Sequence, residues 1–135
     1  MKRPPSHQPK LRRIVIVEDN LDQVHSLALL LKEMGHTVDY AINGYVALDV
    51  VRRFRPDTVI CDLGIPGVTG YEVAEQIKKD PELSGIRVVA LTAYTEDKYR
   101  QRAMEVGFDA FYTKPMDVKQ LYELFGDAKD AFTRG

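Results

Sequence analysis

Short apolar runs alternate with longer amphipathic stretches along this chain. Apolar runs of this length, continuous rather than alternating with polar residues, are typical of parallel strands covered on both faces. They predict five strands. The three strongest runs are residues 14–17, 59–61 and 88–91, and two weaker ones are residues 38–42 and 110–112.

The segments between the runs have hydrophobic residues three and four positions apart, which is the spacing of an amphipathic helix. Gly35 and Gly107 mark the ends of two helices, and Pro56 prevents another from continuing. Alternating strands and helices predict an α/β fold with a parallel sheet between two helical layers. The predicted helices cover residues 24–34, 46–54, 71–77, 96–106 and 118–128.

Polar side chains follow several of the predicted strands. In parallel sheets of this kind, ligands bind beyond the carboxyl ends of the strands. Most of these residues also have a structural interpretation: Asp19, Asn20 or Asp22 could cap a helix, Thr92 suits a strand end, and Lys114 suits a solvated loop. Their joint placement at one edge favours a functional site. The residues at this edge are Glu18, Asp19, Asp62, Thr92 and Lys114.

Three carboxylates in one pocket repel each other, and a divalent cation with oxygen ligands, such as Mg²⁺, removes that conflict. A carboxylate beside such an ion can act as a nucleophile and form an aspartyl phosphate. Lys114 would add a second positive charge, and the Thr92 hydroxyl would add a hydrogen bond to a phosphoryl oxygen. The pattern therefore indicates phosphoryl chemistry at Asp62.

Length and composition limit the class of protein. With 135 residues and 44% hydrophobic residues, the chain has the size and composition of one domain with a real core. No apolar run approaches the roughly 18 residues of a membrane span, and the N-terminus lacks the apolar stretch of a signal peptide. We expect a cytoplasmic protein without membrane insertion. Cys61, the one cysteine, lies in an apolar run and is expected to be a packed, inert thiol.

The charge distribution separates the N-terminus from the rest. Five of the 19 basic residues and none of the 20 acidic residues lie among the first 13 positions. Residues 1–11 are basic and rich in proline, so they are expected to form a disordered leader before a domain at residues 12–133. The remainder is acidic, which argues against direct binding of nucleic acid.

Four motifs make the sequence resemble a receiver domain of the response-regulator family, the aspartate-phosphorylated switches of two-component signalling and phosphorelays. The resemblance spans about residues 12–131 and implies a three-layer (βα)5 flavodoxin-like, doubly wound sheet with strand order 2-1-3-4-5. The motifs are VIVEDN at 15–20, CDLGIPGVTGYEVA at 61–74, LTAY at 91–94 and GFDAFYTKPMD at 107–117.

The resemblance also implies roles for individual residues. Asp62 would be the phosphoacceptor, and Thr92 and Lys114 would contact the phosphoryl group. Mg²⁺ or Mn²⁺ would be bound by Asp19, Asp62 and the Gly64 backbone carbonyl, with Glu18 completing the acidic pair through water.

Further positions are implied to control the switch. The aromatic rotamer of Phe111 would follow Thr92, and the Lys114–Pro115 bond would be cis. Gly64 and Tyr94 occupy positions that tune phosphoryl lifetime in this family. The bulk of Tyr94 could restrict the attacking water, which favours a longer-lived phosphoryl group.

The implied partners are a histidine kinase or histidine phosphotransfer protein as donor and a downstream protein or effector domain. The chain would be a signalling switch that phosphorylates and dephosphorylates itself, not a turnover enzyme. Gly64 and the Lys-Pro-Met-Asp sequence are somewhat closer to receivers of hybrid kinases. The expected binding face comprises the fourth helix, fifth strand and fifth helix, with Lys98, Tyr99, Lys119 and Tyr122 as exposed candidates.

Three other functions remain to be compared with this one. A haloacid-dehalogenase-type phosphatase also uses a strand-end Asp, but it needs a second Asp where this chain has Gly64. A flavodoxin-like FMN carrier needs a phosphate-binding loop after the first strand, where this chain has acidic residues instead. A phosphorylation-independent interaction module would not need the intact set of Asp62, Thr92 and Lys114.

Overall fold

The computed structural model describes residues 11–65 and 67–125. The predicted leader, apart from Leu11, lies outside the described residues, as do residues 126–133 of the predicted domain. Within the described ranges, no helix is long and apolar enough to cross a membrane.

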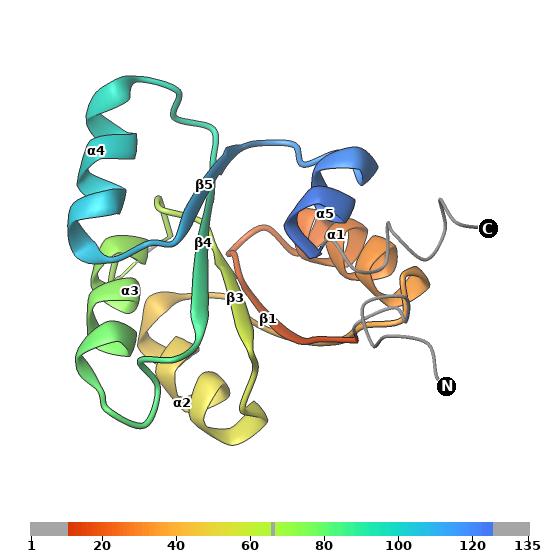
Figure 1. Cartoon of the computed structure of the whole chain (residues 1–135), viewed down its shortest axis with the longest axis horizontal. Helices are drawn as coiled ribbons and strands as arrows, with labels where there is room; N and C mark the ends of the chain where they lie inside the picture. Colours follow the sequence, from red (N-terminus) through yellow and green to blue (C-terminus); the bar gives the residue numbers. More distant parts are fainter. Residues whose placement is uncertain (1–10, 66, 126–135) are drawn as a thin grey trace, which may run out of the picture.

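Five strands alternate with five helices in this part of the chain, as predicted. The strands pair in parallel in the order β2-β1-β3-β4-β5. Helices α1 and α5 cover one face of the sheet, and α2, α3 and α4 cover the other (Figure 1). The flavodoxin-like fold is therefore confirmed. The elements are β1 (Arg13–Val17), α1 (Leu21–Glu33), β2 (Thr37–Ala41), α2 (Gly44–Phe54), β3 (Thr58–Cys61), α3 (Gly70–Lys79), β4 (Arg87–Thr92), α4 (Asp97–Val106), β5 (Ala110–Thr113) and α5 (Val118–Phe125).

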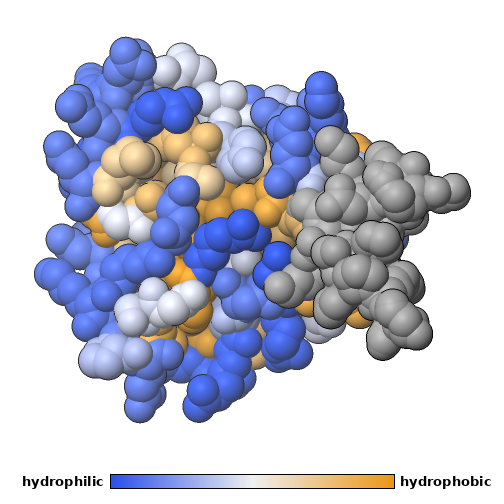
Figure 2. Space-filling model, in the orientation of Figure 1, coloured by the Kyte–Doolittle hydropathy of each residue, from blue (hydrophilic) through white to orange (hydrophobic). Residues whose placement is uncertain are grey.

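Burial on both faces explains the continuous apolar runs. Successive side chains of a strand point to opposite faces, so β1 contributes to two separate cores. Val15 and Val17 pack in the core beneath α2, α3 and α4, whereas Ile14 and Ile16 pack in the core beneath α1 and α5. On the face seen in Figure 2, hydrophobic residues gather near the centre and hydrophilic residues surround them. The sheet is thus held from both sides.

Some boundaries differ from the prediction. Thr92 is the last residue of β4 and does not follow the strand. Ile42 lies beyond the end of β2 and is exposed. Helix α5 ends at Phe125 in the described residues, so its predicted continuation to Ala128 is not described. These differences leave the polar edge of the sheet unchanged.

The start of α3 packs against the residue that follows β3. Thr69 and Glu72 form a capping box, in which each side chain bonds to the other residue's backbone N–H. Gly70 is required here, because a Cβ atom at this position would lie 2.3 Å from the carbonyl oxygen of Asp62. The first turn of α3 therefore packs directly against the backbone of a predicted site residue.

A buried histidine lies near the amino ends of the strands, opposite the end that carries the predicted site. His36 is 4% exposed, and its Nδ1 atom accepts a hydrogen bond from the backbone N–H of Arg12 (3.0 Å). Its ring packs against Phe125 at 4.9 Å between centroids. Burial, together with the charge of Arg12, lowers the pKa of His36 below its ordinary value of 6.5, and Asp57 only partly opposes this. The folded protein therefore favours the neutral ring.

This shift predicts a loss of stability in mild acid. Below pH 6.5 the unfolded chain binds a proton at His36 more readily than the folded chain, so the free energy of unfolding falls as the pH is lowered towards the folded-state pKa. His36→Phe should lower the free energy of unfolding by about 1 kcal/mol at neutral pH, because the Arg12 N–H loses its acceptor. It should also make the free energy of unfolding depend less on pH. Urea titrations at several pH values measure both effects. His25→Phe, on the exposed surface of α1, should keep the wild-type change of unfolding free energy with pH. If His36→Phe keeps it too, His36 is not the cause of the pH dependence.

Candidate functional site

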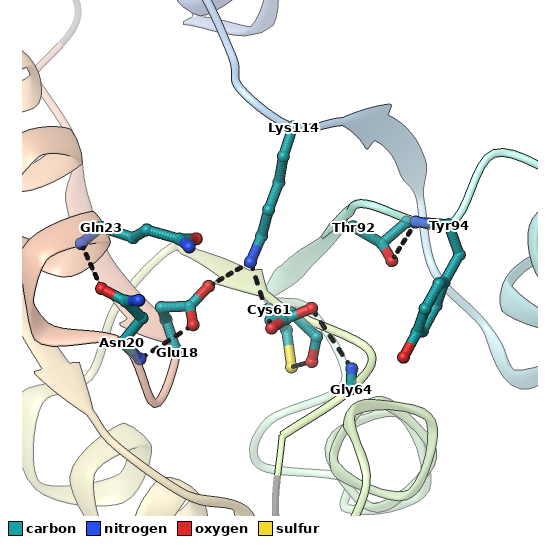
Figure 3. A network of polar contacts seen from close by, with 9 residues as sticks. Glu18, Asn20, Gln23, Cys61, Gly64, Thr92, Tyr94 and Lys114 are labelled. Carbon is teal, nitrogen blue, oxygen red and sulfur yellow. Dashed lines mark hydrogen bonds and ion pairs between the residues drawn. The ribbon is translucent and has the colours of Figure 1, made fainter.

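Three residues far apart in the sequence meet at the carboxyl edge of the sheet. Glu18 follows β1, Asp62 follows β3, and Lys114 follows β5. Lys114 Nζ donates hydrogen bonds to Glu18 Oε1 (2.6 Å) and to Asp62 Oδ2 (3.2 Å), and Figure 3 shows the lysine reaching between the strands. The parallel sheet thus brings together the charged residues predicted from the strand ends.

Burial strengthens these ion pairs. The side chains of Glu18, Asp62 and Lys114 are 7%, 12% and 18% exposed, so water screens their charges only weakly. Burial raises the pKa of Glu18, with Lys114 acting in the opposite direction. Burial alone would lower the pKa of Lys114, but its hydrogen bond to Glu18 and the charges of both carboxylates raise it overall. Lys114 is therefore a permanent cation at this site.

Asp19 completes an acidic cluster, which we define as Glu18, Asp19 and Asp62. One carboxylate oxygen from each residue lies within 4.8 Å of the others. Asp19 is available for this because Asn20, not Asp19 or Asp22, caps α1: its side chain accepts a hydrogen bond from the backbone N–H of Gln23 (3.0 Å). Three oxygen donors beside one lysine fit a hard divalent cation.

The predicted switch residues lie on β4 and β5, the strands that precede Tyr94 and Lys114. Thr92 is fully buried, and its hydroxyl oxygen accepts a hydrogen bond from the backbone N–H of Tyr94 (3.1 Å). Phe111 on β5 is half-buried, with the guanidinium of Arg100 4.7 Å from its ring centroid. The Lys114–Pro115 peptide bond is cis.

Gly64 and Tyr94 meet on one side of Asp62. The Gly64 N–H donates a hydrogen bond to Asp62 Oδ1 (3.2 Å). The Tyr94 ring extends from the end of β4 towards Gly64 (Figure 3), and its hydroxyl would lie 3.2 Å from a Cβ atom at that glycine. The space that glycine leaves empty is therefore bounded by a tyrosine.

The structure corrects two of the predicted surface residues. Lys98 and Lys119 are exposed as expected, but Tyr99 and Tyr122 are half-buried. The ring of Tyr99 stacks on Tyr94, with 4.7 Å between centroids and an interplanar angle of 25°. The spacing of the two tyrosines gave no signal for this contact, because the turn between β4 and α4 brings them together.

Sequence reasoning also missed a cavity of about 620 Å³ that adjoins the acidic cluster. It lies between α1 and the segment that follows β5, and Leu27, Leu30 and Met116 are among its lining residues. The helical spacing of residues 24–34 does not distinguish a core position from the wall of a cavity, so it gave no sign of this space. Cys61, in contrast, is buried as predicted, and burial raises the pKa of its thiol, which keeps it unreactive.

Comparison of the sequence with known proteins finds response-regulator receivers. A sequence model described as the response regulator receiver domain matches residues 14–125. The polar-differentiation response regulator DivK of Brucella anthropi is 34% identical over 112 residues, which are 83% of this chain and 91% of DivK.

Solved structures have the same fold. The signal receiver domain of a signal transduction histidine kinase from Syntrophus aciditrophicus is 31% identical, with a TM-score of 0.78 over 92% of this chain and 94% of that chain. The receiver domain of a sensor histidine kinase from Pseudomonas aeruginosa has a TM-score of 0.78 at 23% identity, covering 86% of this chain and 95% of its own. That structure is described as having a magnesium ion coordinated in its active site cleft.

The acidic cluster predicts that metal affinity depends on Asp19. Asp19→Asn should weaken Mg²⁺ binding by at least about tenfold, equivalent to about 1.4 kcal/mol, because an exposed carboxylate ligand is lost. Isothermal titration calorimetry measures this directly. Asp22→Asn is the matched control, since it removes the same charge from the first turn of α1 without touching the cluster. Equal weakening by both substitutions would indicate a general charge effect and not ligation.

Proposed function

The chain belongs to the response regulator receiver domain family of two-component signalling, and on that premise we propose that Asp62 accepts a phosphoryl group from a phosphohistidine donor. The observation that carries the proposal is the position of Lys114, which bonds to Asp62 and Glu18 at once. One carboxylate is thereby held beside a fixed cation and two further acids, the arrangement that phosphoryl transfer to an aspartate requires.

In the transfer, an Asp62 oxygen attacks the phosphorus atom. The bond between phosphorus and the donor imidazole nitrogen breaks, the nitrogen takes the electron pair, and a bond from phosphorus to the Asp62 oxygen forms. Lys114 lies within 3.2 Å of Asp62 and can exchange its carboxylate contact for a phosphoryl oxygen. The later hydrolysis reverses the covalent state: water attacks phosphorus, and Asp62 leaves as a carboxylate.

Glu18, Asp19, Asp62 and the backbone carbonyl of Gly64 are the residues that would hold Mg²⁺ or Mn²⁺ in this proposal, with Glu18 acting through water. The bound cation would supply positive charge for the phosphoryl oxygens. The donor set supports this assignment, because the acidic cluster offers only oxygen ligands.

Phosphorylation would act as a switch through Thr92 and Phe111. The Thr92 hydroxyl would give up the hydrogen bond that it accepts from the Tyr94 N–H and would bond to a phosphoryl oxygen instead. The Phe111 ring would then turn into the space that Thr92 vacates. Phe111 lies on β5 beneath Arg100 of α4, so such a movement reaches the face formed by α4, β5 and α5. A downstream protein or effector domain would bind this face.

The proposed donor is a histidine kinase or a histidine phosphotransfer protein, and the proposed location is the cytoplasm. The protein would be a switch that undergoes its own phosphorylation and dephosphorylation, and not an enzyme that turns over an external substrate.

The first test of this function is the formation of a covalent phosphate adduct. Incubation with acetyl phosphate and Mg²⁺ should add the mass of one phosphoryl group, measured by intact mass spectrometry. Asp62→Asn should abolish the adduct because the nucleophilic carboxylate is absent, and chelation of Mg²⁺ should reduce it strongly. Asp57→Asn, which changes an aspartate at the opposite edge of the sheet, should be labelled normally. An adduct that persists in Asp62→Asn would disprove the assignment.

The second test concerns the lifetime of that adduct. Tyr94→Ala should accelerate hydrolysis several-fold, because the ring that bounds the space beside Gly64 is removed and water gains access to phosphorus. The decay of the phosphorylated mass after removal of acetyl phosphate gives the rate. A wild-type rate that is already rapid and does not change in Tyr94→Ala would refute this role of Tyr94.

A further inference from the structure

The Tyr94 side chain is in contact with a residue of α4. Tyr94 is 45% exposed and follows the end of β4, so little of its ring is held by the core. The stacked ring of Tyr99, at 4.7 Å between centroids, is the contact that fixes it from the side of α4. Lys98 Nζ lies 5.1 Å from the Tyr99 ring centroid, so a cation lies close to this aromatic pair.

Contacts between cations and rings join α4 to its neighbours, beside the packing of Tyr99, Ala103 and Val106 against the core. Ala103 is the helix's buried residue in the described structure. Arg102 lies 4.1 Å from the ring centroid of Tyr71 on α3, and Arg100 lies 4.7 Å from that of Phe111 on β5. Of the described residues of α4, only Ala103 is fully buried and Tyr99 and Val106 are partly buried, so a displacement of α4 carries Tyr99 with it.

We infer that Tyr99 is a positioning residue that holds Tyr94 beside Gly64, so that the packing of α4 sets the lifetime of the phosphoryl group on Asp62. The inference rests on the proposed function of Asp62. In hydrolysis a water oxygen bonds to phosphorus, the bond from phosphorus to the Asp62 oxygen breaks, and inorganic phosphate and the free carboxylate result. Tyr99 contacts none of these atoms and acts only by keeping the Tyr94 ring where water would enter.

The physical basis is a change in the population of one rotamer. A stacked aromatic pair contributes enough to favour the stacked position by about two- to tenfold over an unstacked side chain. Loss of the stack therefore leaves Tyr94 free to turn into solvent, and access of water to phosphorus increases by a similar factor. A protein bound to α4 that displaced Tyr99 would have the same effect, which ties partner binding to the duration of the signal.

Hydrolysis rates of a matched set of variants test this inference. Each protein is phosphorylated with acetyl phosphate and Mg²⁺, and the excess acetyl phosphate is removed. The decay of the phosphorylated mass is then followed over time. Tyr99→Ala should accelerate hydrolysis about two- to tenfold, and by no more than Tyr94→Ala does. Tyr99→Phe keeps the ring and should restore the wild-type rate. Tyr99→Leu, which retains an apolar side chain without a stack, should behave as Tyr99→Ala and serves if the alanine variant does not fold.

The double variant separates positioning from a general loosening of the fold. If Tyr99 acts through Tyr94, the combination of Tyr94→Ala with Tyr99→Ala should hydrolyse at the rate of Tyr94→Ala alone. Multiplied effects would overturn the inference. Mg²⁺ affinity should remain at the wild-type value in Tyr99→Ala, and Met104→Ala, an exposed position on α4, should not alter the lifetime.

The outcomes also distinguish this inference from the proposed function. Absence of any adduct in the wild-type protein would remove the proposed function itself. Normal labelling of Asp62 with identical lifetimes in the wild type, Tyr99→Ala and Tyr99→Leu would remove only the role of Tyr99.

Discussion

Electrostatic repulsion among Glu18, Asp19 and Asp62 is the constraint that organises this molecule. Three carboxylate oxygens within 4.8 Å of one another repel, and the charge of one lysine offsets only part of their negative charge. Lys114 reaches the cluster because all the paired strands are parallel and end on the same side of the sheet. The remaining negative charge favours a hard cation with oxygen ligands at this site.

The rest of the fold keeps this cluster rigid. Burial of β1 and β3 on both faces fixes the backbone from which the acids project. Close backbone contacts then fix the loops: a Cβ atom at Gly70 would meet the Asp62 carbonyl, and one at Gly44 would lie 1.9 Å from the Val68 carbonyl oxygen. Packing at van der Waals distance thus holds in place the segments that carry charge.

The sequence predicts those parts of the structure that depend on periodicity. Strands, helices, the layer order and the group of Glu18, Asp62 and Lys114 follow from hydrophobic spacing and from the convergence of strand ends. Contacts made by side chains across a turn have no such periodicity. The Tyr94–Tyr99 stack and the hydrogen bond from Arg12 to His36 involve residues of the connecting segments, and the choice of Asn20 as helix cap depends on local backbone angles. Tyr99 was expected to be exposed for the same reason.

Helices α3 and α4 both have ten residues, but they differ greatly in how they are attached to the sheet. The buried residues of α3 are Gly70, Tyr71, Val73, Ala74 and Ile77, whereas α4 buries Ala103. Local unfolding requires the least free energy where the least apolar surface is lost. We therefore expect backbone amides of α4 to exchange with solvent deuterium through an opening of that helix at a lower free energy than those of α3.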